Sequence, residues 1–217
     1  IFGDNHGNYT HFFERECSLQ RRYQKVIEES PSLSLTPELR QKMGDAAVAA
    51  AKSIRYNNAG TVEFILDRKG NFYFLEVNTR LQVEHPITEE TTGLDLVRLQ
   101  IEVASGLPLT VTAKDVKQAG NAIECRICAE DPANNFFPAT GEILYWDEPA
   151  INGMRYDSGV QSGSKVDVFY DSMIAKVISY AGTRNEAIQK MVYALDNMPI
   201  LGITTNKDFL EELLLHQ

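Results

Sequence analysis

Polar and apolar side chains alternate from position 76 to position 84 of this 217-residue chain. In an extended strand, alternate side chains point to opposite faces, so a strand here would gather the polar ones on one face. An amphipathic edge strand alternates in the same way, so it is the residue types that indicate chemistry. Carboxylates can ligate a metal ion and a guanidinium can hold an anion. A carboxylate beside a bound acid can also take its proton, which makes Glu84 a candidate general base, with Arg80 holding the conjugate anion. The five polar residues are Glu76, Asn78, Arg80, Gln82 and Glu84.

A second carboxylate is predicted to lie opposite Glu76 in a β-hairpin. Residues 61–67 and 71–77 have strand-like patterns around a Lys69-Gly70 turn, and this turn pairs Glu63 with Glu76. Like charges directly opposite destabilise a sheet unless a cation lies between them, and Mg²⁺ prefers carboxylate oxygens. We therefore predict a divalent-cation site, while two carboxylates that simply face water stay an alternative. The same register pairs Asp67 with Phe72 and places Ile65 and Phe74 on the face of the two carboxylates.

Lysine and arginine together number 21 against 30 aspartates and glutamates, so their clustering is informative. Three of them fall within five positions of the segment 20–25, where Lys25 supplies a compact charge. This run predicts a clamp for an anionic substrate, with a solvated basic face as the alternative. Arg126 lies among apolar strand-like residues, where an arginine is usually a buried ion-pair partner and less often part of an active site. Glu124, on the same face, is a candidate partner.

The composition, 43% hydrophobic and 24% charged, is typical of a soluble globular protein. The net charge of −9 argues against binding nucleic acid through its phosphates, and no apolar run approaches the roughly 20 residues of a membrane span. Cys17, Cys125 and Cys128 form no disulfide framework and suit a reducing compartment. The CxxC spacing of the last two lacks a second pair for zinc and falls in a strand-like run, 121–128, so we expect packing cysteines.

The remaining patterns predict an α+β chain with two regions and a connector at about 110–118. Turn residues, helix caps and apolar periods define its elements. The first region is expected to contain a hairpin of 1–3 with 9–16, a helix from Pro37 to about Arg55 capped by Thr36, the hairpin 61–77, and a helix 94–105 with an apolar stripe of Leu94, Val97, Ile101 and Ala104. The second is expected to contain strands at 121–128, 142–146, 165–169 and 174–180, a helix capped by Thr183 that runs to about Asn197, and a C-terminal helix capped by Thr205.

Together these segments resemble biotin carboxylase, the ATP-grasp component of the biotin-dependent carboxylases. A single Glu-x-Asn-x-Arg would indicate only an ATP-grasp enzyme, whereas its combination with Gln-Arg-Arg, Gln-Val-Glu-His-Pro and Glu-Cys-Arg is highly specific. The resemblance runs from the first residue to the last and is carried by residues 14–25, 74–86, 124–127 and 170–176. It implies an α+β fold, with the C-terminal half of an ATP-grasp domain over residues 1–106. A biotin carboxylase C-terminal domain, an antiparallel sheet with helices, would follow over residues 118–217.

In that family the enzyme uses ATP, bicarbonate and Mg²⁺ or Mn²⁺ to carboxylate the N1′ nitrogen of biotin on a carrier protein, through carboxyphosphate. This is the first half-reaction of the biotin-dependent acyl-CoA and pyruvate carboxylases. The resemblance implies three partners: a biotin carboxyl carrier, a carboxyltransferase component and a second copy of the chain. It implies no nucleic acid and no membrane, and a cytoplasmic or mitochondrial-matrix location. The family's phosphate lid and ATP-binding lysines would precede Ile1, so we expect this chain by itself to be an inactive fragment.

The resemblance also implies a role for each matching residue. Glu84 would remove the bicarbonate proton, and Arg126 would stabilise the biotin enolate. Tyr23 occupies a position that is His in some members, and Arg155 resembles a dimer-interface arginine. The metal ligands would be Glu63 and Glu76, assisted by Asn78. The bicarbonate pocket would comprise Lys25, Arg80, Gln82, Val83 (through its backbone) and Glu84. ATP would be contacted by Gln20, Tyr23, Glu63 and Glu76, and the catalytic set would be Glu84, Arg80, Arg126 and Lys25.

Two other interpretations remain open from the sequence. Another carboxyphosphate-forming ATP-grasp ligase, of the carbamoyl phosphate synthetase type, would share the Glu-x-Asn-x-Arg segment but would cleave ATP without regard to biotin. A non-catalytic module would keep the dimer and carrier contacts alone. A degenerate module has no physical need to keep four mutually costly charged groups together, which favours an enzyme as the parent protein. Those four are Glu63, Glu76, Arg80 and Glu84.

Overall fold

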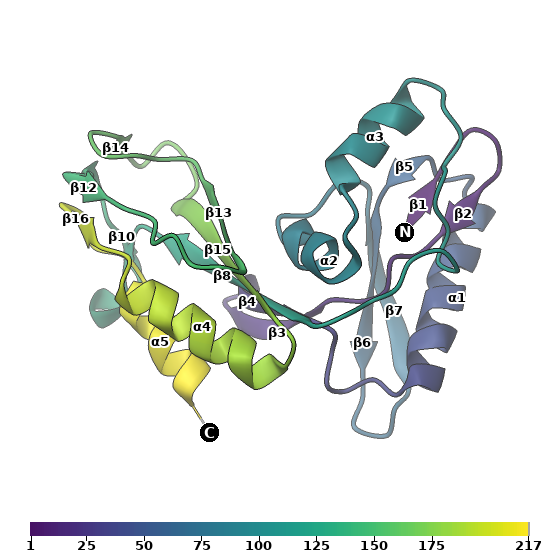
Figure 1. Ribbon diagram of the computed structural model, residues 1–217, viewed down its shortest axis with the longest axis horizontal. Helices are drawn as coiled ribbons and strands as arrows, with labels where there is room; N and C mark the ends of the chain where they lie inside the picture. The colour runs from purple at the N-terminus through teal and green to yellow at the C-terminus, as the bar shows by residue number, and fades with distance from the viewer. Residues whose placement is uncertain (217) are drawn as a thin grey trace. The chain divides into compact units, whose positions relative to one another are not determined.

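The computed structural model describes residues 1–216, which fold into two compact units (Figure 1). The first unit combines residues 1–16 with 30–119, and the second combines residues 17–29 with the chain from Gly120 onward. Strand pairing carries the hairpin of β3 (Glu16–Arg21) and β4 (Gln24–Ser30) into the sheet of the second unit. Such long-range pairing leaves no local signal in the sequence.

The first unit contains a short three-stranded sheet and three helices. Strand β1 (Phe2–Gly3) lies between β2 (Tyr9–Thr10) and β5 (Asn58–Ala59). The predicted N-terminal hairpin is therefore present, but its second strand is much shorter than expected. The helices are α1 (Pro37–Ser53), α2 (His85–Thr92) and α3 (Leu96–Ala104). The Thr36 side chain caps α1 as predicted.

Helix α3 buries a different stripe from the predicted one. Asp95 caps it, and the side chains that enter the core are Leu96, Leu99 and Val103. Val97 and Ile101, which belong to the predicted apolar stripe, are 43% and 64% exposed. The helix carries apolar residues on two adjacent stripes, so periodicity predicted the helix, while packing against the core decided which stripe is buried.

The predicted second hairpin is formed by β6 (Thr61–Leu66) and β7 (Phe72–Asn78), and it pairs Glu63 with Glu76 as expected. Its turn is held by the Asp67 carboxylate, whose Oδ1 accepts hydrogen bonds of 2.8 Å from two backbone amides of the turn. The two predicted metal ligands therefore lie directly opposite one another across the strands.

The predicted register is wrong close to the turn. Leu66, and not Asp67, lies opposite Phe72, and a β-bulge between the turn and the two glutamates absorbs this one-residue shift. Because each added residue inverts the alternation, Phe74 lies on the face opposite to the predicted one. Tyr73 takes its place on the face of the two carboxylates.

Asp4 ties the N-terminal hairpin to the segment after α3. Its Oδ1 accepts hydrogen bonds of 2.9 Å from the amides of His6 and Asn8. Its Oδ2 accepts 2.7 Å bonds from the Asn8 side chain and the Leu109 amide. Burial by itself would raise the pKa of Asp4, but these four hydrogen bonds outweigh burial and lower the pKa to about 2.

We predict that Asp4→Asn removes part of the acid sensitivity of the first unit. The folded state lowers the pKa of Asp4 from 3.8 to about 2. Its carboxylate therefore contributes roughly 2 kcal/mol above pH 4, and this contribution is lost as the pH falls from about 4 to about 2. Hydrogen exchange at the Leu109 amide, measured in the protein that contains this chain, should lose protection across that window in the parent and much less in the variant. Equal pH dependence in the two proteins would contradict the prediction.

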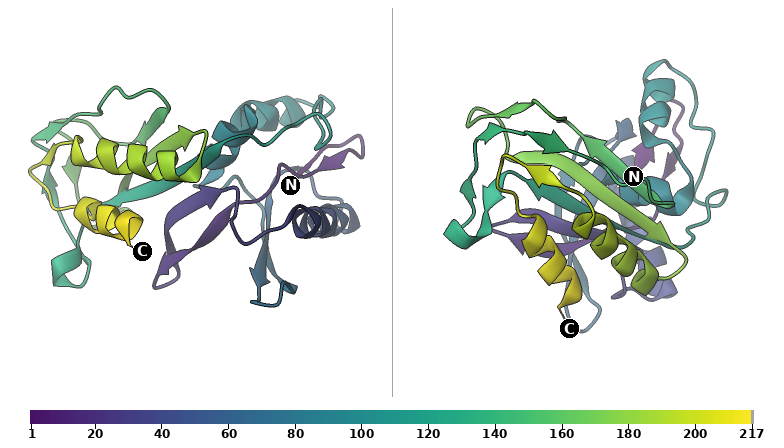
Figure 2. Two further views of the ribbon diagram at one scale, coloured as in Figure 1. Left: turned by 60° about the horizontal axis from the view of Figure 1, so that its bottom comes forward. Right: turned by 60° about the vertical axis from the view of Figure 1, so that its left-hand side comes forward.

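The second unit is built on a five-stranded sheet of order β13-β15-β8-β4-β3. Its strands β13 (Met154–Ser158), β15 (Met173–Ala181) and β8 (Asn121–Cys128) are antiparallel neighbours. Helices α4 (Arg184–Asp196) and α5 (Lys207–Leu215) cover one face of this sheet (Figures 1 and 2). Their contact with the sheet encloses the core of the unit, which includes Ile127, Val177, Met191, Leu195 and Leu210.

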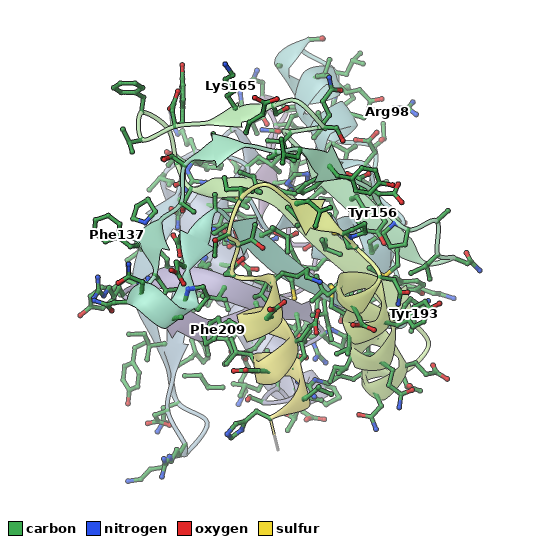
Figure 3. The ribbon with its side chains drawn as sticks, turned by 90° about the vertical axis from the view of Figure 1, so that its left-hand side faces the viewer. Arg98, Phe137, Tyr156, Lys165, Tyr193 and Phe209 are labelled. Carbon is green, nitrogen blue, oxygen red and sulfur yellow. The ribbon has the colours of Figure 1, made fainter. Side chains whose placement is uncertain are left out.

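Thr183 and Glu186 form the predicted capping box of α4. Helix α5 begins after Asn206 instead of the predicted Thr205. The Asn206 side chain accepts a hydrogen bond from the Cys128 amide (2.8 Å) and donates one to the Arg126 carbonyl (2.9 Å), so it fixes the start of α5 to β8. Figure 3 shows Phe209 projecting from α5, and its ring meets that of Phe136 edge-on with centroids 4.9 Å apart.

Short paired strands and one turn of 3₁₀ helix complete the second unit. They follow the predicted strand positions only in part, since each strand is two residues long. They are β9 (Glu130–Asp131), the 3₁₀ helix (Pro132–Asn134), β10 (Phe137–Pro138), β11 (Gly141–Glu142), β12 (Tyr145–Trp146), β14 (Lys165–Val166) and β16 (Ile200–Leu201).

None of the three cysteines, all of which lie in the described part of the chain, is in a disulfide. The predicted strand over residues 121–128 is β8, and burial raises the pKa of the Cys125 thiol within it. Among residues 1–216 there is no cluster of three or more His, Cys, Asp or Glu side chains arranged to hold a metal ion. None of the helices in this described part of the chain is long and apolar enough to cross a bilayer.

Candidate active site

The three predicted metal ligands meet at the end of the β6–β7 hairpin. The Asn78 amide donates hydrogen bonds to Glu63 Oε1 (3.0 Å) and Glu76 Oε1 (3.1 Å). A single amide therefore bridges the two carboxylates that face each other across the strands. A cation bound at this position could therefore contact an oxygen of each carboxylate.

This donor set fits Mg²⁺ or Mn²⁺ held jointly with a nucleotide. Mg²⁺ is usually bound by one or two carboxylates together with substrate phosphates and water, rather than by an all-protein cage. Glu63 and Glu76 supply two carboxylates, and Asn78 supplies an amide oxygen if its side chain turns over. The remaining positions of an octahedral ion would be left to phosphate oxygens and water.

The polar residues after β7 do not share one strand face, which corrects the simplest form of the prediction. Strand β7 ends at Asn78, and the chain bends at Arg80 before it turns into α2. Arg80 is exposed, whereas Gln82 and Glu84 are only 5% and 2% exposed. The bend therefore separates the polar residues of this segment into an exposed guanidinium, that of Arg80, and a buried amide and carboxylate, those of Gln82 and Glu84.

Helix α2 was missed by the sequence reasoning, although two signals mark it. Pro86 lies in its first turn, where the missing amide hydrogen costs nothing. Gly93 ends it with a φ of 72°, the left-handed conformation that glycine adopts without strain. The alternation of residues 76–84 concealed the helix start, because Glu84 was assigned to a strand and is instead the helix N-cap.

Gln82 joins the buried polar residues of the segment 80–84 to the predicted metal ligands. Its Nε2 donates a 2.9 Å hydrogen bond to Glu63 Oε1, the oxygen that also accepts from Asn78. The Gln82 carbonyl accepts bonds from the His85 backbone amide (3.2 Å) and Nδ1 (2.8 Å). The first unit thus brings together Glu63, Glu76, Asn78 and Gln82, with Val83 and Glu84 following directly in the turn.

The predicted nucleotide contacts lie on the β3–β4 hairpin of the second unit. Gln20, near the end of β3, donates to the Cys17 carbonyl at 2.8 Å. Tyr23 lies in the turn and is 97% exposed, and Lys25 lies at the start of β4. Arg22 and Tyr23 both have positive φ, 48° and 66°, which shapes the two-residue turn between the strands.

Two of the clustered cations contact neighbouring residues of the second unit, and the anion clamp stays a prediction. Arg21 lies over the Phe136 ring, 3.7 Å from its centroid, and also donates to the Asn135 carbonyl at 3.1 Å. Arg22 donates to Asn135 Oδ1 at 3.2 Å. Both arginines therefore fasten the hairpin to the segment before β10.

The acidic partner of Arg126 is on a neighbouring strand. Arg126 Nε donates to Glu28 Oε1 of β4 at 2.7 Å, and Nη2 reaches the same oxygen at 2.5 Å. The sequence pointed to Glu124, two residues away on the same strand. Glu28 belongs to a strand that pairs with β8 only in the folded sheet, so sequence spacing gave no indication of it. Its carboxylate has no exposed surface.

A row of charged side chains continues from Arg126 across the sheet. Lys176 of β15 lies directly opposite Arg126, and Asp157 of β13 lies opposite Lys176. Asp157 Oδ2 is 3.0 Å from the Lys176 ammonium, and its oxygens accept from Arg155 at 2.8 and 3.0 Å. Burial would raise the pKa of Asp157, but the hydrogen bonds from Arg155 and Lys176 lower it.

Two family models cover most of the chain. Residues 1–112 match the carbamoyl-phosphate synthase L chain, ATP binding domain, and residues 124–217 match the biotin carboxylase C-terminal domain. The chain belongs to the biotin carboxylase family. The second match favours this family over a ligase of the carbamoyl phosphate synthetase type, which the first match alone would also fit.

Similar proteins agree with this family. The chain is 55% identical over 206 residues to biotin carboxylase 2 of Bacillus subtilis (strain 168), covering 95% of the chain and 46% of that protein. It is 51% identical over 218 residues to the mitochondrial propionyl-CoA carboxylase alpha chain of Mus musculus, covering 100% of the chain and 30% of that protein. The chain therefore spans less than half the length of these relatives.

A solved biotin carboxylase has nearly the same backbone. It is the domain dimer of Hydrogenobacter thermophilus 2-oxoglutarate carboxylase, crystallised with MgADP, ADP and bicarbonate. The TM-score is 0.97 at 45% identity, covering 100% of this chain and 48% of that one. The expected α+β fold, part of an ATP-grasp domain followed by a biotin carboxylase C-terminal domain, is confirmed.

Proposed function

We propose that the polypeptide containing this chain carboxylates biotin on a carrier protein, using ATP and bicarbonate. The observation that carries this proposal is the hydrogen-bonded group at the end of the β6–β7 hairpin. There Gln82 and Asn78 both donate to Glu63 Oε1, and Asn78 also reaches Glu76. One continuous set of bonds thus links a candidate metal-nucleotide site to a candidate bicarbonate site, which a ligase that joins ATP cleavage to bicarbonate requires.

Two groups of residues are assigned to the metal ion and the nucleotide. Glu63 and Glu76, with Asn78, would hold Mg²⁺ or Mn²⁺, and Gln20 and Tyr23 would contact the nucleotide. A bound divalent ion would neutralise charge that develops on the phosphates during transfer.

Bicarbonate would be held by Lys25, Arg80, Gln82 and the Val83 backbone. Glu84 would take the bicarbonate proton, so that the oxyanion attacks the γ-phosphorus and displaces ADP to give carboxyphosphate. Because Glu84 is buried, bulk water does not compete for this proton.

The second step would form carboxybiotin. Carboxyphosphate would break down to CO₂ and phosphate, and the phosphate would remove the N1′ proton of biotin. Arg126 would stabilise the resulting enolate oxygen, with its guanidinium held in place by Glu28. The deprotonated N1′ would then attack the carbon of CO₂ to give carboxybiotin, whose carboxyl group would be passed to a carboxyltransferase component.

Three partners belong to the same proposal: a biotin carboxyl carrier, a carboxyltransferase and a second copy of the chain. Arg155 is on β13, an outer strand of the five-stranded sheet, where a second copy could lie beside it. The Hydrogenobacter relative is described as a dimer, and the mouse relative as a mitochondrial protein. A mitochondrial-matrix or bacterial cytoplasmic location is proposed accordingly.

The test is ADP production by the full-length polypeptide with MgATP and bicarbonate, with and without free biotin. We expect bicarbonate-dependent ADP formation that biotin stimulates. Bicarbonate-dependent cleavage indifferent to biotin would instead support another carboxyphosphate-forming ligase. No bicarbonate-dependent cleavage at all would support a non-catalytic module.

A further inference from the structure

Arg15, a half-buried arginine outside the assigned site, is hydrogen-bonded to the Gln82 amide of that site. Arg15 Nη2 donates to Gln82 Oε1 at 2.8 Å and to Thr61 Oγ1 at 2.9 Å, and Nη1 donates to Thr88 Oγ1 at 3.0 Å. These oxygens belong to the segment after β7, to β6 and to α2. A single guanidinium therefore joins the segment that carries the candidate bicarbonate ligands to β6, which carries Glu63, and to α2.

The contact with Arg15 decides which way the Gln82 amide points. An amide has one oxygen that accepts and one nitrogen that donates. Because the guanidinium occupies the Gln82 oxygen, the amide nitrogen is turned to Glu63, where it makes the 2.9 Å bond to Oε1. In the opposite orientation, the Gln82 amide nitrogen would face the Arg15 guanidinium, so two donors would meet. The Gln82 amide oxygen would face the Glu63 carboxylate, so two acceptors would meet.

We propose that Arg15 is a positioning residue that couples the metal carboxylate Glu63 to the bicarbonate amide Gln82. This rests on the proposed function of the site. Through one amide, Arg15 fixes both the donor that meets Glu63 and the donor left to meet an oxygen of the anionic substrate. A residue that served only to fasten β6 to α2 would contribute to stability without influencing either ligand.

Lysine cannot replace Arg15 in this role. The guanidinium presents donors in a rigid planar fork, whereas an ammonium is a point charge on a flexible stem. Arg15→Lys keeps the charge but cannot reach three oxygens in fixed directions. We expect it to raise the bicarbonate KM about tenfold, the effect of one charge-assisted hydrogen bond, with a smaller effect on the KM for MgATP.

The full-length polypeptide should be tested with two readouts in addition to turnover. Mn²⁺ affinity, followed by electron paramagnetic resonance in the presence of ADP and without turnover, should fall about threefold in Arg15→Lys. The matched control is Arg40→Lys in the same unit, because Arg40 is also half-buried and makes a two-pronged bond to Glu14 at 2.7 and 2.8 Å. The control should lower the melting temperature and leave the bicarbonate KM and Mn²⁺ affinity unchanged.

A double-mutant cycle separates positioning from fastening. If Arg15 acts through Gln82, then Arg15→Lys should add little to the bicarbonate KM of Gln82→Leu, because the amide it orients is already absent. Independent, multiplying effects would overturn the proposal. So would a bicarbonate KM and Mn²⁺ affinity in Arg15→Lys that match those of Arg40→Lys.

Failure of the proposed function can be told apart from failure of this inference. If the parent polypeptide shows no bicarbonate-dependent ADP formation, the function is wrong, and Mn²⁺ affinity alone then decides whether Arg15 positions Glu63. If Arg15→Lys does not fold, Thr61→Val replaces it, since it removes the oxygen that shares Nη2 with Gln82. Parent-like Mn²⁺ affinity and bicarbonate KM in that variant would overturn the proposal.

Discussion

Glu84→Gln in the full-length polypeptide is expected to lower bicarbonate-dependent ADP formation by at least about 100-fold, which is the usual contribution of a general base. Glu84 is 2% exposed, and glutamine has nearly its shape, so packing around it should persist. Glutamine cannot accept a proton from bicarbonate, so the oxyanion would not form. A coupled ADP assay at saturating MgATP and bicarbonate measures the effect on kcat.

The control for this variant is Glu102→Gln. Glu102 lies on α3 of the same unit and pairs with the exposed Arg98 at 2.8 Å, away from the candidate ligands in the sequence and on another helix. We expect its kcat to equal that of the parent. MgADP should bind to Glu84→Gln as tightly as to the parent, since the carboxylate is needed for the proton and not for the nucleotide. More than about a tenth of the parent kcat in Glu84→Gln would contradict its assignment as the base.

The parts of the site that the sequence predicted are those encoded by neighbouring residues. The Glu63–Glu76 pair followed from two strand patterns and the turn between them, and it is correct. The register near the turn was wrong because the Asp67-capped turn takes up one more residue, and a bulge compensates further along. The pairing therefore holds, while the assignment of Tyr73 and Phe74 to faces does not.

The parts that were missed depend on segments distant in sequence. Glu28 reaches Arg126 only because β4 enters the second sheet, and Arg21 and Arg22 find their partners in residues 135–136. Residue type predicted that Arg126, which lies among apolar residues, needs an acidic partner. Identifying the partner required the strand order, which local periodicity does not contain.

Arg126→Met is expected to destabilise the second unit by about 3–5 kcal/mol, because it leaves a buried carboxylate without its cation. Glu28 is fully buried and Arg126 is 17% exposed, so solvent screens their attraction little. Hydrogen exchange of the β8 and β4 amides in the full-length polypeptide would measure the loss locally. The neighbouring pair Arg184–Glu29 is the control, because its side chains are 36% and 17% exposed, and Arg184→Met should cost about 1 kcal/mol or less.

The double variant Arg126→Met, Glu28→Leu separates stability from catalysis. Replacing both charges by apolar groups removes the stranded carboxylate, and such replacements of buried pairs are often neutral. Protection of β8 should therefore return to nearly the parent level. Biotin stimulation of ADP formation should stay absent, because the enolate still lacks its cation. If biotin stimulation recovered together with stability, Arg126 would serve only to neutralise Glu28. Another cation would then have to stabilise the enolate. Lys176, which lies directly opposite Arg126 on β15, is the first to test.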